Sequence, residues 1–200
     1  MVTTVLVLYD TRSGATGRLA AQVARGVEGS GDAEALLRSV PDLRSANEPP
    51  SDRVPVAGSP HVTLDELSAC DALAVGSPTR FGNMSGAMKA FWDSTTSLWL
   101  NGALIDKPAT VFTSSASPHG GQESTLLTMM VPLLHHGMLL TGVPYSTPEL
   151  NSTPGGGSPY GPGFVAAHSD APLLPEEREI ARVAGARLAT LAARLGSTAT

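Results

Sequence analysis

A short polar loop follows the first apolar run of the sequence and carries hydroxyl side chains at close spacing. The apolar run covers residues 5–9, and the loop after it reads Thr11-Arg12-Ser13-Gly14-Ala15-Thr16. Hydroxyls at positions 11, 13 and 16 can bond to phosphate oxygens, and the glycine permits a tight turn. The N–H groups and dipole of a helix beginning here would also favour an anion. The loop therefore suits a terminal phosphate, although Ser and Thr are also favoured as ordinary N-caps.

Two later loops have compositions that suit a flat ligand. One is the run Pro78-Thr79-Arg80-Phe81-Gly82-Asn83-Met84, and the other is Ser114-Ser115-Ala116-Ser117-Pro118-His119-Gly120-Gly121. In the first, an aromatic ring, a glycine and an amide can border a heterocycle whose polar atoms meet backbone N–H groups. The small residues of the second allow close backbone approach. Each run taken singly is also consistent with a plain surface turn.

Several other chemistries are excluded by the same patterns. The first loop is neither a Gly-x-Gly-x-x-Gly fingerprint nor a Walker loop, and no Gly-x-Ser-x-Gly elbow surrounds Ser13. The five histidines lack His-x-x-x-His spacing and a carboxylate or cysteine cluster, so we expect no metal site. The single Cys70 excludes a disulfide within the chain and a cysteine-based zinc site.

Composition limits the class of protein further. The sequence has 200 residues, of which 42% are hydrophobic and 16% charged, with a net charge of −5. Such a chain can bury a substantial core, and its acidic balance argues against nucleic-acid binding. No apolar run approaches the ~18 residues of a membrane span or resembles a signal segment. We therefore expect a single cytoplasmic domain covering residues 1–200.

The three loops need a scaffold that brings them together, and the hydrophobic pattern predicts one. Strand-like runs alternate with helical patterns, which predicts a doubly wound parallel sheet of five strands with helices on both faces. In such sheets the ligand lies beyond the carboxyl ends of the strands, where the strand order reverses. The strands are expected at 5–9, 35–37, 73–76, 110–113 and 138–140. The helices are expected from about 16, and at 63–69, 85–98, 122–135 and from 175, with irregular segments at 41–62 and 146–172.

Four segments of this chain resemble one known family. They occur in the family's order and spacing, and they are residues 78–84, 120–123, 135–138 and 156–161. Together they resemble the WrbA-type FMN-dependent NAD(P)H:quinone oxidoreductases. The resemblance implies a flavodoxin-like fold, one bound FMN per chain and a homotetramer. It also implies hydride transfer from NAD(P)H to a quinone, which is reduced by two electrons to the hydroquinone.

The resemblance also assigns roles to residues of this sequence. Residues 11–16 would hold the FMN phosphate, while 78–83 and 114–120 would border the two sides of the isoalloxazine ring. His135 would reach the flavin of a neighbouring subunit and is a candidate proton donor. Trp99 would lie over the place where nicotinamide or quinone stacks.

The chain departs from this family in two places. Ser13 stands where relatives commonly have an aromatic residue that helps to place the nicotinamide nucleotide. The third loop carries one extra residue, with Pro118 and His119 replacing smaller groups. The Ser13 departure keeps open a flavodoxin-like electron carrier, and a non-catalytic flavin-binding scaffold is a further alternative.

Overall fold

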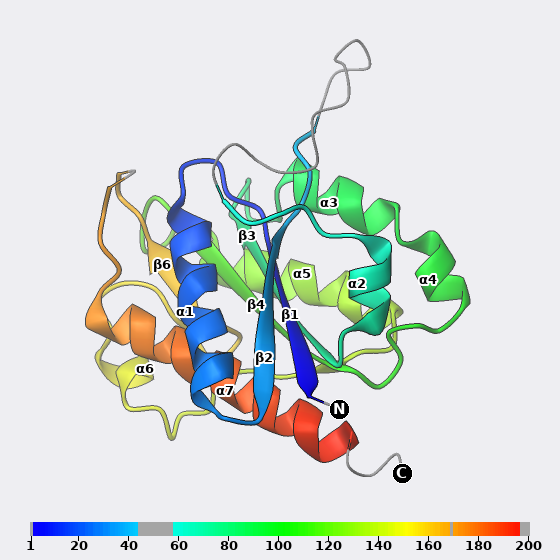
Figure 1. The fold of residues 1–200 in the computed structure, drawn as a ribbon. Coiled ribbons are helices and arrows are strands. Elements are labelled where there is room, and N and C mark those ends of the chain that lie inside the picture. The colour runs from blue at the N-terminus through cyan, green and yellow to red at the C-terminus, as the bar shows by residue number, and fades with distance from the viewer. Residues whose placement is uncertain (1, 44–57, 169, 197–200) are drawn as a thin grey trace.

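A parallel β-sheet forms the centre of the molecule (Figure 1). The structure is a computed structural model and describes residues 2–43, 58–168 and 170–196. Its strands are β1 (Thr3–Tyr9), β2 (Ala33–Ser39), β3 (Ala72–Pro78), β4 (Pro108–Ser115), β5 (Leu139–Leu140) and β6 (Gly163–Val165). The strand order is β2-β1-β3-β4-β5, and every pair in it is parallel. The predicted doubly wound sheet and its five expected strands are therefore confirmed.

Helices cover both faces of this sheet, as Figure 1 shows. The helices are α1 (Ala15–Gly29), α2 (Leu64–Ala69), α3 (Gly86–Asp93), α4 (Thr96–Leu100), α5 (Gln122–His135), α6 (Glu149–Ser152) and α7 (Pro175–Gly196). One core joins α1 and α7 to alternate residues of the sheet such as Val5, Val7 and Phe112. The other core joins α2, α3 and α5 to the intervening residues, including Leu6 and Leu8. Both sides of the central strands are thus buried, which accounts for their unbroken apolar sequence.

The first and last helices lie against one another with unusually close backbones. A Cβ atom on Gly26 of α1 would lie 2.0 Å from the carbonyl oxygen of Arg182 in α7. A Cβ atom on Gly185 would likewise lie 2.1 Å from the carbonyl oxygen of Val23. These two glycines allow the helix that begins at the first loop to rest directly on the C-terminal helix.

The predicted capping box at the start of α2 is confirmed. The Thr63 hydroxyl accepts a hydrogen bond from the Glu66 N–H, and the Glu66 carboxylate accepts one from the Thr63 N–H. Glu66 also forms an ion pair with Arg38 of β2, at 2.7 Å. The arginine lowers the pKa of the Glu66 carboxyl group, and its hydrogen bond is the largest cause. Local sequence chemistry therefore fixes both the start of α2 and its attachment to the edge of the sheet.

The single helix expected over 85–98 is wrong, because the chain forms α3 and α4 instead. The break falls at Ser94 and Thr95, two consecutive hydroxyl residues between α3 and α4. Ser94 donates its hydroxyl to the carbonyl of Phe91, and Thr95 donates to that of Trp92. Such local side-chain bonds compete with the helical backbone pattern. The chain therefore ends α3 at Asp93 and begins a separate helix, α4, at Thr96.

The segment 146–172, expected to be a loop, also contains regular structure. It forms the short helix α6 and the three-residue strand β6, and β6 pairs in parallel with Thr113–Ser115 at the carboxyl end of β4. The strand β5 occupies the other end of the same edge, opposite Pro108 and Ala109. The edge of β4 is therefore shared between two strands from different parts of the sequence.

Of the surface excursion expected over 41–62, residues 44–57 lie outside the described residues. On its described side, His61 forms an isolated bridge with Ser39 at the end of β2. No helix in the described part of the chain combines the length and apolarity needed to cross a membrane.

Candidate functional site

The three loops singled out in the sequence meet at the carboxyl ends of β1, β3 and β4. They enclose a cavity of about 400 Å³, called here the loop cavity. It is lined by Thr11, Arg12, Ser13, Ala15, Thr16, Pro78, Thr79, Arg80, Ser114, Ser115, Ala116, Ser117, Gly120 and Ala166. The cavity lies at the carboxyl end of β1, where the strand order reverses because β2 lies on one side of β1 and β3 on the other. This is where a doubly wound sheet is expected to bind its ligand.

The first loop leaves the N-terminus of α1 open toward the loop cavity. Gly14 is the N-cap residue in a left-handed conformation with φ +83°, and no side chain caps the helix. The first turn of α1 carries no acidic residue, so nothing there repels an anion. The Thr11 hydroxyl oxygen is buried without a hydrogen-bond partner among the described residues. The buried hydroxyls of Thr16 and Ser114 lie 2.8 Å apart and join the first loop to the third.

The second loop is a tight turn that holds an aromatic side chain away from the protein. The N–H of Arg80 donates to the carbonyl of Asn83 at 2.8 Å, and the N–H of Asn83 donates back at 3.0 Å. The two central residues, Phe81 and Gly82, both have positive φ, at 53° and 76°. Phenylalanine is uncommon in this backbone region. The Phe81 side chain is fully exposed to solvent in the single chain.

The third loop is held by buried polar side chains at its base. Ser115 donates its hydroxyl to the carbonyl of Ser117 at 2.7 Å and accepts a hydrogen bond from Gln122 at 2.9 Å. Gly121 begins α5 at φ +90°, and a Cβ atom there would lie 3.1 Å from the Cα of Gly82. The second and third loops therefore touch through glycine backbones, which leaves no room for side chains between them.

Sequence reasoning missed one residue that lines the loop cavity. Ala166 follows β6 directly, and its N–H donates to the carbonyl of Ser115 at 2.8 Å. The segment around it was expected to be irregular, and an alanine has no chemical group that would mark it. Only the pairing of β6 with β4 brings Ala166 to the cavity.

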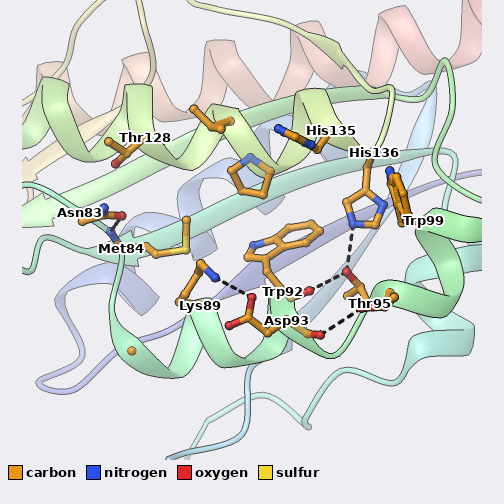
Figure 2. A pocket seen from close by; sticks show the side chains of 14 residues that line it. Asn83, Met84, Lys89, Trp92, Asp93, Thr95, Trp99, Thr128, His135 and His136 are labelled. Carbon is orange, nitrogen blue, oxygen red and sulfur yellow. Dashed lines mark hydrogen bonds and ion pairs between the residues drawn. The ribbon is translucent and has the colours of Figure 1, made fainter.

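A second cavity of about 750 Å³ lies between α3, α4 and α5 and is called here the aromatic cavity (Figure 2). It is lined by Asn83, Met84, Gly86, Lys89, Trp92, Asp93, Thr95, Thr96, Trp99, Thr128, Val131, Pro132, His135 and His136. The two residues given roles outside the first three loops, Trp99 and His135, both belong to it. Asn83 connects it to the second loop, whose Arg80 lines the loop cavity.

A buried histidine forms one wall of the aromatic cavity. His136 packs against Trp92 with ring centroids 5.5 Å apart, and its Nε2 lies 2.9 Å from the Thr95 hydroxyl oxygen. Because Thr95 donates its single hydroxyl proton to the carbonyl of Trp92, the histidine Nε2 must carry a proton and donate to Thr95. The Nδ1 atom is then a buried acceptor without a partner among the described residues. Burial, and secondarily the nearby charge of His135, lowers the pKa of His136.

The structure separates the predicted site residues into three groups. Those of the loop cavity are 11–13, 15–16, 78–80, 114–117 and 120. Asn83, Trp99 and His135 line the aromatic cavity instead. Gly14, Phe81, Gly82, Pro118 and His119 line neither cavity, and Pro118 and His119 are exposed on the third loop. Among the described residues, no three His, Cys, Asp or Glu side chains gather as metal ligands would.

A doubly wound parallel sheet with a hydroxyl-bearing loop at the start of its first helix is typical of flavodoxin-like proteins. Comparison with known proteins agrees with that class. A WrbA-like flavodoxin from Agrobacterium tumefaciens has a TM-score of 0.69 and 25% sequence identity, covering 96% of this chain and 98% of that chain. An archaeal flavodoxin with 19% identity and a TM-score of 0.64, covering 95% of this chain and 99% of that one, shares the fold.

Sequence comparison gives the family. The NADPH-dependent FMN reductase family matches residues 3–149. Proteins named NAD(P)H dehydrogenase (quinone) from Geobacter sulfurreducens and Syntrophobacter fumaroxidans are 43% and 42% identical, each over 96% of this chain and 98% of the relative. This chain belongs to the NADPH-dependent FMN reductase family, and the resemblance inferred from its four motifs is confirmed.

Proposed function

We propose that this chain is an FMN-dependent oxidoreductase that transfers a hydride from NAD(P)H, through bound FMN, to a quinone. The observation that carries the proposal is the position of the loop cavity, at the reversal of strand order and directly against the uncapped N-terminus of α1. The aromatic cavity on the other side of the second loop provides the apolar surface that a flat quinone requires.

The residues of the loop cavity fit FMN. A phosphate group would satisfy the buried Thr11 hydroxyl and the open end of α1, where hydroxyls at 13 and 16 are also available. The second loop, through Pro78 to Asn83, and the third loop, through Ser114 to Gly120, would border the ring. The hydroxyls and free N–H groups at the start of α1 suit one terminal phosphate, and the sequence lacks a dinucleotide fingerprint.

Bound FMN would supply the hydride chemistry, and the protein supplies position and electrostatics. The hydrogen bond between the hydroxyls of Thr16 and Ser114 connects the first loop, which would hold the phosphate, to the third loop. Trp99 offers an aromatic face to a planar donor or acceptor, which would occupy the same slot in turn. His135 lines the aromatic cavity and is one of two candidate proton donors to the reduced quinone. The other candidate is water.

We further propose that the chain, as one domain of residues 1–200, assembles as a homotetramer in the cytoplasm. The outer side of α5 presents Leu127, Val131 and Leu134, which are 46%, 52% and 57% exposed at one-turn spacing. Trp99 and Leu100 of α4 add further exposed apolar surface, 51% and 70% exposed. Soluble monomers rarely expose such contiguous apolar surface. The family resemblance implies that His135 reaches the flavin of a neighbouring subunit, which such an assembly would allow.

The proposal is tested by the colour and turnover of the purified chain. The protein should be yellow, should release FMN rather than FAD on heating, and should bleach when NADH or NADPH is added. It should then oxidise NAD(P)H at a steady rate in the presence of benzoquinone. An electron carrier, the alternative that Ser13 favours, would bind FMN but show almost no turnover. A scaffold would show none, and release of FAD would contradict the role of the first loop.

A further inference from the structure

The structure contains a buried carboxylate, Glu177, that the proposed reaction does not use. We propose that Glu177 is a positioning residue for the loop cavity, fixing β6 against β4 so that both walls of the FMN site are complete. The inference rests on the proposed FMN-dependent function. Glu177 is only 1% exposed and lies in the first turn of α7. Carboxylates are almost never buried this completely unless their oxygens are satisfied by hydrogen bonds.

Both oxygens of the Glu177 side chain are satisfied by backbone donors. Oε2 accepts a hydrogen bond from the N–H of Leu174 at 2.8 Å, which closes the N-terminus of α7. Oε1 accepts two more, from the N–H of Gly156 at 2.8 Å and from the N–H of Val165 at 2.9 Å. A residue acting only as a helix cap would make the first bond alone. The other two reach 21 and 12 residues back along the chain.

These contacts hold β6 from the side opposite to β4. Gly156 lies so close to β6 that a Cβ atom on it would be 2.4 Å from the carbonyl carbon of Gly163. The strand has only three residues and pairs on one edge. Its ladder with β4 is therefore short, and strands of this length have little independent stability. The hydrogen bonds that Gly156 and Val165 donate to the Glu177 carboxylate therefore stabilise the position of β6 in addition to its short ladder with β4.

From β6, two contacts lead to the loop cavity. The first continues along the chain, because Ala166 follows Val165, lines the cavity, and donates its N–H to the carbonyl of Ser115. Ser115 is itself a cavity residue held by Gln122. A displacement of β6 would therefore move Ala166 and release the base of the third loop.

The second contact leads to the first loop through an arginine. The guanidinium of Arg18, in α1, lies 5.5 Å from the centre of the Phe164 ring of β6. It also donates to the carbonyl of Ala171 at 3.3 Å. A Cβ atom on Gly14 would lie 3.3 Å from Nη1 of this arginine, so the cation sits directly beside the uncapped end of α1. Because Glu177 holds β6, it also fixes the position of the Phe164 ring against which the Arg18 guanidinium packs.

The test compares FMN affinity with stability in three variants of the full-length chain after removal of flavin. Glu177→Ala removes all three bonds, and Glu177→Gln keeps the shape but replaces one acceptor oxygen with a donor. Leu188→Ala is the matched control, because Leu188 is fully buried on the same helix and packs in the core, but takes no part in the three hydrogen bonds of Glu177. FMN dissociation constants are measured by quenching of flavin fluorescence, well below the melting temperature of every variant.

We expect Glu177→Ala to raise the FMN dissociation constant by about tenfold or more, and Glu177→Gln by severalfold, because several backbone donors lose their acceptor. Leu188→Ala should lower the melting temperature without changing FMN affinity by more than about twofold, since it only removes core contacts. Amide hydrogen exchange supplies a second readout. The N–H groups of Val165 and Ala166 should exchange faster in the Glu177 variants and remain protected in Leu188→Ala.

Equal losses of FMN affinity in Glu177→Ala and Leu188→Ala would overturn the positioning role, and so would unchanged affinity in the Glu177 variants. If Glu177→Ala does not fold, the comparison of Glu177→Gln with Leu188→Ala decides the question in the same way. Failure of the unmodified chain to bind FMN would overturn the proposed function and this inference together. If the unmodified chain binds FMN and the Glu177 variants bind it with the same dissociation constant, only this inference would be overturned.

Discussion

The two cavities are neighbours across the second loop but differ in how the chain completes them. The loop cavity is bordered by hydroxyls and backbone groups whose positions are fixed within one chain, for example by the bond between Thr16 and Ser114. The aromatic cavity is bordered by Trp99, Val131 and His135, all exposed in the single chain. The loop cavity is formed within one chain, whereas we propose that the aromatic cavity is completed by a second subunit.

The two cavities suit two different requirements of one active site, which are tight binding of a resident group and successive binding of two planar substrates. Tight binding of a resident group needs rigid donors that are ordered before the ligand arrives. Two different planar substrates entering the same slot in turn need an apolar surface with few directional bonds. The comparison predicts that substitutions in the loop cavity alter FMN content, while substitutions around the aromatic cavity alter assembly and turnover.

The largest effect is expected on the outer side of α5. Leu127→Glu places a charge in the apolar surface that we assign to the subunit contact, so the assembly should dissociate and quinone reduction should fall with it. Sedimentation should then give species near the 20.5 kDa of one chain. Leu195→Glu is the matched control, because Leu195 is similarly exposed, at 41% against 46%, but lies at the end of α7. An active monomer in the unmodified protein would contradict a shared site.

The next effect is expected in the first loop. Thr11→Val should raise the FMN dissociation constant by roughly 10- to 160-fold, since a hydrogen bond to a charged group contributes about 1.5–3 kcal/mol. The flavin-free protein should keep its melting temperature, because the Thr11 hydroxyl has no partner among the described residues. Thr16→Val should weaken FMN binding too, but also destabilise the protein by breaking its bond to Ser114. A stable Thr11→Val protein with unchanged FMN affinity would place the phosphate elsewhere.

A smaller effect is expected at Ser13, which is exposed at the rim of the loop cavity. An aromatic contact contributes about 0.5–1.5 kcal/mol, so its absence should weaken NAD(P)H binding by roughly 2- to 12-fold. Ser13→Tyr should lower the Michaelis constant for NAD(P)H and leave FMN content and the quinone half-reaction unchanged. Stopped-flow measurement of the two half-reactions separates these effects. Unchanged donor kinetics would mean that the nucleotide does not pass over residue 13.

The smallest effect is a pH dependence of stability that originates in the aromatic cavity. Because burial lowers the pKa of His136 below 6.5, the unfolded chain binds a proton more readily than the folded one. Its contribution to the free energy of unfolding is present above about pH 6.5 and is lost as the pH falls toward the folded pKa, by at most about 1.4 kcal/mol per pH unit. Urea unfolding between those limits measures the slope. The control is His136→Gln, whose side-chain amide can still donate to the Thr95 hydroxyl while every other titratable residue is unchanged. The difference between the two proteins in the slope of unfolding free energy against pH therefore gives the contribution of His136.

The sequence predicted those parts of the fold that depend on neighbouring residues. The buried strands, the capping box at Thr63 and the start of α7 at Pro175 were each marked by local composition. The strand β6 was not, because three residues after a glycine-rich run have no period and gain their conformation from pairing with β4. The break after Asp93 was missed for a different reason: the hydroxyls of Ser94 and Thr95 compete with a helix that their apolar neighbours favour.

The same distinction applies to the site. The loop residues around Thr11, Thr79 and Ser115 were predictable because they directly follow apolar runs that mark buried strands, and parallel strands end at one edge. Ala166 and Glu177 were not, since neither residue type indicates a cavity wall or a long-range backbone contact. Trp99 and His135 could be brought together only through the family resemblance, because the turn between α3 and α4 decides where Trp99 lies.

The close packing of α1 on α7 has a consequence for synthesis of the protein. The helix that follows the first loop packs against α7, about 160 residues later in the sequence, through Gly26 and Gly185. At a translation rate of about 5–20 residues per second, the ribosome needs roughly 10–40 s to reach that partner. The packing that supports the helix after the first loop can therefore form only once α7 has been made. We therefore expect flavin loading to follow the synthesis of α7, and chains that stop before this helix to bind flavin poorly.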